Sequence, residues 1–171
     1  GMLKDCEVPE PGDTEVLMEN SYSMVSAGTE VANLLRLPNT ETFDKGFPNQ
    51  PGYSAAGRVI AAGKNVKRLK VGDRVVIAWG GHRSHTIKNE NEILKIEDNS
   101  IDLLDASMAH IASFAFLGVR KLKIEIGESA MVAGIGILGA FAVQIAGLSG
   151  AIPVIASDRD PVRRDLALKL G

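Results

Sequence analysis

The alternation of apolar and polar positions predicts short strands in the first part of the chain. Residues 15–20 alternate apolar and polar side chains, as a half-buried strand does. Residues 57–79 hold two β-branched runs around turn signals at 63–65 and 72–73, and residues 92–98 predict another short strand. Many short strands separated by glycines favour a small, barrel-like all-β unit.

The hydrophobic period changes after Asn99. Residues 100–122 carry apolar side chains at helical spacing, with Ser100 and Asp105 as candidate caps. The rest of the pattern predicts a short buried strand over 129–134, a helix over 139–150, an apolar strand over 151–158 and a helix over 159–171. Strand, helix, strand and helix in this order form a βαβ unit, which requires a parallel sheet.

The final predicted helix has clear start and stop signals. Asp160 stands at its N-cap position, Pro161 at its first helical position and Gly171 where a C-terminal glycine belongs. Pro153 falls near the start of the preceding strand, where a missing N–H donor is tolerated. About two strands are too few for a complete doubly wound sheet. We therefore expect a fragment, or a sheet whose missing strands come from another chain or were never made.

Composition narrows the class of protein. The chain has 171 residues, 45% of them hydrophobic and 23% charged, so it can bury a sizeable core. A net charge of −2 without long runs of one sign argues against nucleic acid or an anionic membrane as the main partner. Cys6 is the only cysteine, which excludes an internal disulfide and any multi-cysteine zinc site. No uncharged stretch is long enough to cross a bilayer and no secretory signal is evident, so a cytoplasmic location is expected.

Three glycines in the second part have the spacing G-x-G-x-x-G, after a predicted strand and at the start of a predicted helix. The first glycine permits a tight turn, the second lets the backbone approach a pyrophosphate, and the third lets the helix pack closely on the strand. Amides and the macrodipole at the helix N-terminus favour such an anion. The candidate cofactor-binding residues of this loop are Gly134, Ile135, Gly136, Ile137, Leu138 and Gly139.

Asp158 ends the second predicted strand, nineteen residues after Gly139. This position fits the acidic residue that accepts hydrogen bonds from the adenosine ribose, and its charge favours NAD(H) over NADP(H). Arg159 leaves NADP(H) open, because an arginine here can bind the 2′-phosphate. Three alternatives remain: a structural turn, another adenosine ligand such as S-adenosylmethionine, and a solvated Asp158 that caps the next turn.

Several spaced motifs resemble those of medium-chain dehydrogenases and reductases. Residues 51–76, PGYSAAGRVIAAGKNVKRLKVGDRVV, are similar to the family's GHE-x-x-G-x-V…GDRV segment, and residues 8–30 to its opening PxPGxGEVLV…GICGTD. Residues 127–171 resemble its cofactor-binding start. The resemblance implies an α/β plus β fold: a GroES-like β-barrel catalytic domain over 1–115, then the first, truncated βαβα part of a Rossmann dinucleotide-binding domain over 116–171.

The sequence departs from the family pattern at the catalytic zinc ligands, which are a cysteine, a histidine and a further cysteine or glutamate. Alignment places Ala27 at the cysteine, Tyr53 at the histidine and His110 near the third position. Alanine has no donor and tyrosine is a poor zinc ligand, so no zinc is predicted. His82 and His85 could share an ion, but no nearby acidic or cysteine partner completes the set, and exposed loop histidines are expected instead.

The resemblance implies an NAD(P)(H)-dependent oxidoreductase that moves a hydride to or from an alcohol, ketone or conjugated carbonyl without zinc. Thr29 matches the Ser/Thr that passes a proton in zinc-dependent relatives, and the Tyr53 phenol could donate a hydrogen bond to a developing oxyanion. His110 either contacts the substrate, in a cleft that faces Thr29 and Tyr53, or is a satisfied, partly buried histidine. The alternative for Thr29 and Glu30 is turn capping and a surface charge.

Two functions of other classes stay open at this point. The chain could be a folded, inactive fragment that assembles through an exposed sheet edge, or a regulatory protein that binds NAD(H) without chemistry. The expected partners are a small-molecule substrate and, as an option, further copies of the chain.

Overall fold

The computed structural model describes residues 3–52 and 54–171. The chain divides into two compact units, Gly1–His110 and Ile111–Gly171. The division lies inside α4 (Ala109–Leu122), and the domain boundary after residue 115 stays a prediction. None of the described helices is both long and apolar enough to span a membrane.

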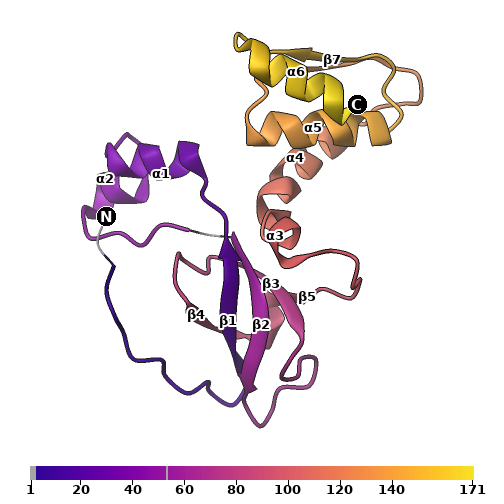
Figure 1. Ribbon diagram of the computed structural model, residues 1–171. Coiled ribbons are helices and arrows are strands. Elements are labelled where there is room, and N and C mark those ends of the chain that lie inside the picture. Colours follow the sequence, from indigo (N-terminus) through magenta and orange to yellow (C-terminus); the bar gives the residue numbers. More distant parts are fainter. Residues whose placement is uncertain (1–2, 53) are drawn as a thin grey trace. The chain divides into compact units, whose positions relative to one another are not determined.

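The first unit is built on a curled antiparallel sheet, which confirms the barrel-like all-β unit (Figure 1). Its five strands have the order β4-β1-β2-β3-β5, so the three central strands, β1, β2 and β3, lie side by side in the order in which they occur in the sequence. β2 and β3 are joined by residues 63–73, which carry the predicted turn signals, whereas residues 24–53 separate β1 from β2. The strands are β1 (Glu15–Ser23), β2 (Ser54–Ala62), β3 (Arg74–Ala78), β4 (His85–Asn89) and β5 (Ile93–Lys95).

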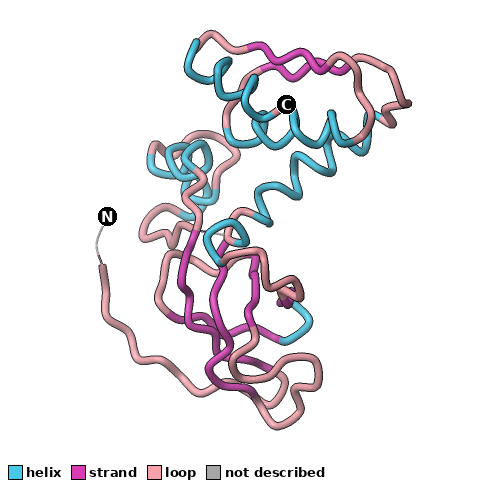
Figure 2. The backbone as a smooth tube through the Cα atoms, turned by 45° about the vertical axis from the view of Figure 1, so that its right-hand side comes forward, coloured by secondary structure: helices cyan, strands magenta, loops and turns pink. Residues whose placement is uncertain are grey.

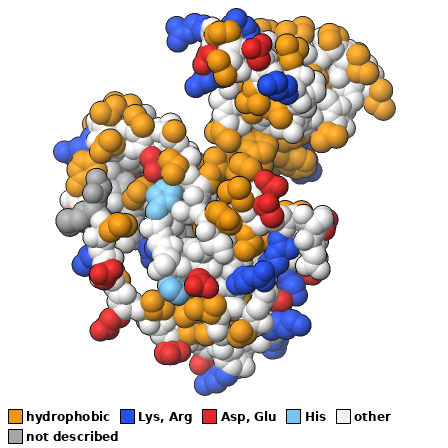
Figure 3. Space-filling model, in the orientation of Figure 1, with side chains coloured by type: hydrophobic (Ala, Val, Ile, Leu, Met, Phe, Trp, Pro, Cys, Tyr) orange, Lys and Arg blue, Asp and Glu red, His pale blue; other side chains and the backbone are white. Residues whose placement is uncertain are grey.

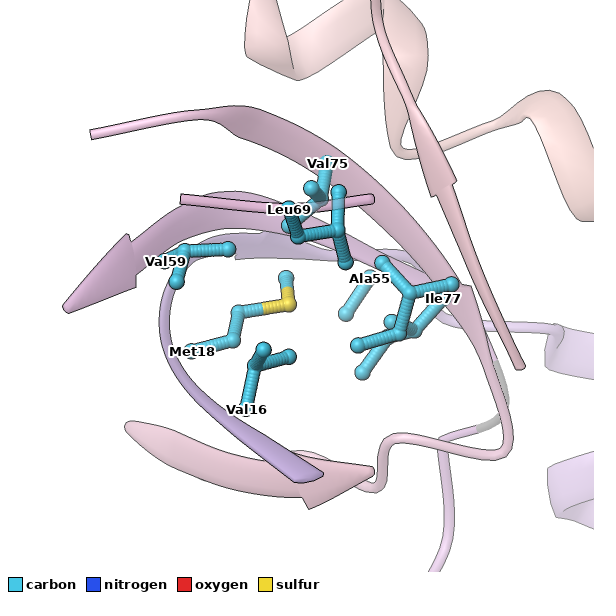
Figure 4. Close-up of a cluster of buried hydrophobic side chains, with 8 residues drawn as sticks. Val16, Met18, Ala55, Val59, Leu69, Val75 and Ile77 are labelled. Atoms are coloured by element: carbon cyan, nitrogen blue, oxygen red, sulfur yellow. The ribbon is translucent and has the colours of Figure 1, made fainter. Parts of the chain in front are cut away.

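Alternate side chains of these strands fill the inside of the curl (Figure 4). Val16 and Met18 of β1 are completely buried, but Leu17 between them is buried too, so the alternation predicted for residues 15–20 is only partly right. Burying one such side chain contributes about 1.5–3 kcal/mol, so this cluster stabilises the curl against opening. The cluster consists of Val16, Met18, Ala55, Val59, Leu69, Val75, Ile77 and Ile93.

Two short helices interrupt the strand-rich part of the chain. The sequence analysis predicted only strands and turns there, and in this respect it was wrong. They are α1 (Ala27–Leu34) and α2 (Glu41–Lys45). α1 buries none of its residues, and Val31 and Leu34 are more than half exposed, so no core-facing stripe marks it as a helix. Figure 3 shows hydrophobic side chains gathered over both helices. α2 is fixed locally, because the side chain of Thr40 caps it.

The helical pattern after Asn99 is confirmed, but it forms two helices rather than one. α3 (Leu103–Ala106) is followed by α4. The predicted caps Ser100 and Asp105 are wrong: Asp102 is the N-cap, and its Oδ1 accepts the backbone N–H of Asp105 at 2.7 Å. The hydroxyl of Ser100 instead donates to the carboxylate of Asp98.

The second unit confirms the βαβα order. β6 and β7 pair in parallel, and α5 and α6 lie on the same side of them (Figures 1 and 2). The predicted signals at the last helix are confirmed, since Asp160 accepts from the N–H of Val162 at 2.9 Å and Pro161 opens the helix. The elements are β6 (Ala130–Ala133), α5 (Ile137–Leu148), β7 (Val154–Ser157) and α6 (Pro161–Leu170).

Only one face of this two-stranded sheet is covered within the unit. Val132 and Val154 pack against the helices, whereas Met131 and Ile155 are register partners with exposures of 64% and 48%. The prediction that 129–134 forms a buried strand is therefore wrong for one face. A strand of a parallel sheet is buried on both faces only when helices lie on both sides.

Candidate functional site

The glycine loop joins β6 to α5 in the second unit, and two of its glycines are required by backbone geometry. Gly134 has φ +88°, a left-handed conformation that glycine adopts without strain. Its N–H donates to the carbonyl of Ser157 at 2.7 Å, which anchors the turn to β7. At Gly139, an added Cβ would overlap the carbonyl oxygen of Gly134, so the helix approaches the turn more closely than any side chain allows.

The N-terminus of α5 is open. Gly136 is the N-cap residue and supplies no side-chain hydrogen bond, and the first turn contains no acidic residue. A Cβ at Gly136 would meet nothing within 4 Å. The first amides of a helix lack intrahelical acceptors and attract anions. Ile137 and Leu138 follow in the first turn, so the loop fits a diphosphate group.

Asp158 lies beside the glycine loop, as the sequence predicts for the residue that ends the second strand. Its Oδ2 accepts the N–H of Ile135 at 2.7 Å, and its Oδ1 accepts the N–H of Asp160 at 2.9 Å. These backbone donors, with a smaller contribution from Arg163, lower the pKa of Asp158. The carboxylate is therefore ionised at neutral pH. It caps the next turn, as one alternative held, but its side chain is only 10% exposed and also braces the loop.

Three arginines, at positions 159, 163 and 164, follow Asp158 closely in the sequence. The Nη1 atom of Arg163 is 3.7 Å from Oδ2 of Asp158, and Arg164 donates to the carbonyl of Arg159 at 3.0 Å. Arg159 itself is exposed. The carboxylate favours NAD(H), because it accepts hydrogen bonds from the ribose hydroxyls, whereas a guanidinium group favours NADP(H), because it can bind the 2′-phosphate. The preference for NAD(H) therefore stays a prediction.

The predicted catalytic residues fall in the first unit. Thr29 lies in the first turn of α1, where its Oγ1 accepts the hydroxyl of Ser26 at 3.1 Å. Tyr53 lies outside the described residues. His110 is the second residue of α4, its ring lies 5.9 Å from that of Trp79 in an edge-to-face contact, and burial lowers its pKa. This arrangement agrees with a partly buried, neutral imidazole, and the contact of His110 with substrate stays a prediction.

His82 is the main residue that the sequence prediction misjudged. An exposed loop histidine without an acidic neighbour was expected, but the side chain is only 26% exposed and its Nε2 lies 2.9 Å from Oε1 of Glu30. Its Nδ1 lies 2.8 Å from Oγ of Ser23. His85 contacts only the adjacent Ser84 through a described hydrogen bond, at 3.0 Å. Glu30 is 52 residues from His82 in sequence, so no local spacing could reveal the pair.

The absence of a catalytic zinc stays a prediction, because residue 53, at one of the three aligned ligand positions, lies outside the described residues. No group of three or more His, Cys, Asp or Glu side chains among the described residues could hold a metal ion. Ala27, at the first ligand position, begins α1 and has no donor atom.

The lowered pKa of His110 predicts an acid-sensitive contribution to stability. When the folded state lowers a histidine pKa, the unfolded chain binds the proton more readily, so stability falls as pH drops through the unfolded value near 6.5. We expect the free energy of unfolding to decrease from about pH 7.5 to about pH 5.5 more in the wild type than in His110→Gln. Urea titrations followed by circular dichroism measure this, and equal decreases in both proteins would contradict it.

A small curled β unit followed by a parallel βαβ unit with an open glycine loop defines a medium-chain dehydrogenase/reductase. Residues 12–145 match the family model of the alcohol dehydrogenase GroES-like domain, and the chain belongs to this family. The predicted family and fold class are thereby confirmed.

Individual relatives agree with this assignment. An alcohol dehydrogenase of Aspergillus clavatus is 24% identical over 99% of this chain and 50% of its own length. The fold matches 2R,3R-butanediol dehydrogenase from Bacillus subtilis with a TM-score of 0.83, at 20% identity over 98% of this chain and 57% of that one. It also matches Escherichia coli quinone oxidoreductase, solved with NADPH, with a TM-score of 0.80, at 24% identity over 98% and 51%. The chain thus spans about half the length of the curated relatives it matches.

Proposed function

We propose that the protein is a zinc-independent, NAD(P)(H)-dependent oxidoreductase. The observation that carries the proposal is the glycine loop, in which Gly134 and Gly139 hold a turn that no side chain permits while Gly136 leaves the α5 N-terminus open. A purely structural turn would not need an uncapped helix N-terminus there. The bound cofactor supplies hydride acceptance or donation, and the chain supplies binding, orientation and proton transfer.

The cofactor would bind through residues of the second unit. The amides that open α5, from Ile137 onward, would hold the diphosphate, and Asp158 would accept hydrogen bonds from the adenosine ribose. Because Asp158 is ionised and held against the loop, we propose that NAD(H) is preferred over NADP(H). Arg159 and Arg163 are the residues through which NADP(H) would compete.

The substrate would bind to the first unit near Thr29 and Tyr53, with His110 as a further contact. Ala27 argues for hydride transfer without zinc, because a site that lacks a ligand atom at this position cannot complete the usual donor set. Relatives named for butanediol and for quinones support an alcohol, ketone or conjugated carbonyl as substrate. A small-molecule substrate and a cytoplasmic location are part of this proposal.

Thermal stability with cofactor tests the proposal. NADH at about a hundred times its Kd should stabilise the protein by roughly 2.7 kcal/mol, and NADPH at the same concentration should stabilise it less. Asp158→Asn removes the charge and should narrow the difference between the two cofactors. If neither nucleotide raises the melting temperature, the cofactor proposal is wrong. One tightly bound zinc per chain in the purified protein would overturn the zinc-free part.

A further inference from the structure

The loop that carries His82 packs directly against the segment that leads into Tyr53. Gly81 donates its N–H to the carbonyl of Gly52 at 2.6 Å, and His82 donates its N–H to the carbonyl of Pro51 at 2.9 Å. Gly52 has φ +92°, and a Cβ there would lie 2.7 Å from Nδ1 of His82. The imidazole therefore occupies the space that a side chain at position 52 would fill.

The other edge of the imidazole reaches the first turn of α1, which carries Thr29. Oε1 of Glu30 lies 2.9 Å from Nε2 of His82, and it accepts a hydrogen bond from the backbone N–H of Ser26 at 3.2 Å. His82 thus connects the segments that hold Thr29 and Tyr53, two of the three predicted catalytic residues, although neither segment lies close to it in sequence.

The hydrogen bonds define which ring nitrogen of neutral His82 carries the proton. An ionised carboxylate only accepts hydrogen bonds, so Nε2 must donate to Glu30. Nδ1 is then an acceptor, and the hydroxyl of Ser23, 2.8 Å away, must donate to it. A hydroxyl, an imidazole and a carboxylate in this order are the arrangement in which a carboxylate orients a base and the base activates a hydroxyl.

We propose that Ser23, His82 and Glu30 form the proton relay of this enzyme, an inference that rests on the proposed function. During alcohol oxidation the substrate O–H proton passes to Oγ of Ser23 while the Ser23 proton passes to Nδ1 of His82. A cofactor held by the amides that open α5 would accept the substrate C–H electron pair as hydride while the C=O bond forms. The resulting imidazolium stays paired with Glu30, and carbonyl reduction follows the same path in reverse.

The charges around the ring favour this direction of transfer. Glu30 is the anion in contact with His82, and it stabilises the imidazolium rather than the neutral ring. The neighbouring cation, Arg83, has its guanidinium engaged by the side-chain oxygen of Gln50. Ser23 is the catalytic residue that would touch the substrate oxygen, and Glu30 is a positioning residue.

Substitutions in the relay test it, with His85 from the same loop as the matched control. With 2,3-butanediol and NAD⁺ as probes, His82→Gln should lower kcat by about 10²–10⁴-fold, the usual contribution of general acid–base catalysis, and should flatten the pH–rate profile between pH 5 and 8. Ser23→Ala should give a similar loss. His85→Gln should change neither the rate nor the profile. A His82→Gln enzyme within twofold of wild type and with an unchanged profile would overturn the relay.

Ring-nitrogen NMR provides a second measurement that needs no turnover. Two-bond ¹H–¹⁵N spectra should show neutral His82 protonated at Nε2, and Glu30→Gln should change the ring ¹⁵N chemical shifts of His82 while leaving those of His85 unchanged. A neutral His82 protonated at Nδ1 would overturn the relay whatever the kinetics show. If the wild type binds neither nucleotide nor oxidises the probe, the proposed function fails separately, because the spectra still decide the arrangement of the three residues.

Discussion

Gly139→Val should destabilise the second unit by about 1–3 kcal/mol or more and should abolish nucleotide binding. The new Cβ would overlap the carbonyl oxygen of Gly134, which belongs to backbone and cannot rotate away. Either α5 moves off the loop or Gly134 leaves its φ of +88°. Both movements displace the amides that would hold the diphosphate. Chemical denaturation and titration with NADH measure the two effects.

Gly147 offers a matched control in the same helix. It lies within α5, and a Cβ there would meet nothing within 4 Å. Gly147→Ala should therefore stabilise the unit by roughly 0.5–1 kcal/mol, because glycine is a poor helix residue, and should leave nucleotide binding unchanged. If Gly139→Val were as stable as wild type, the close approach of helix and turn would not exist in solution.

The elements predicted well are those whose signals lie within a few residues of one another. These signals are the N-cap Asp160, the proline that follows it, and the glycine spacing that begins at Gly134. Each involves residues only a few positions apart, and the structure places all of them as expected. Asp158 could also be placed, because the carboxyl end of a parallel strand lies at the same edge as the loop after its neighbour. The hydrogen bond from Ile135 to Asp158 is the result of that topology.

The parts that could not be predicted depend on contacts between distant segments. α1 lacks a buried stripe, so its periodicity gives no signal, and it is held by contacts that include Glu30 with His82. The same pair changes the chemistry of the candidate site, because a loop histidine becomes a partly buried base. Fifty-two residues separate the two side chains, and only the antiparallel sheet brings their segments together.

Gly136→Asp should leave the unit at least as stable as wild type while weakening NADH binding by a hundredfold or more, which corresponds to about 2.7 kcal/mol. Gly136 has φ −77° and ψ −168°, an extended conformation that aspartate adopts without strain, and space is open around its Cβ. As an N-cap, aspartate should contribute a few tenths of a kcal/mol over glycine, and its charge should interact favourably with the helix dipole.

The same carboxylate would occupy the amides that a diphosphate needs and would repel its charge, so stability and affinity should change in opposite directions. Gly136→Asn separates the two causes, because it caps the helix with the same shape but carries no charge. It should bind NADH more weakly than wild type but more tightly than Gly136→Asp, and the gap between the two variants should narrow as salt screens the repulsion. If Gly136→Asp bound NADH as tightly as wild type, the diphosphate would not lie at this helix N-terminus.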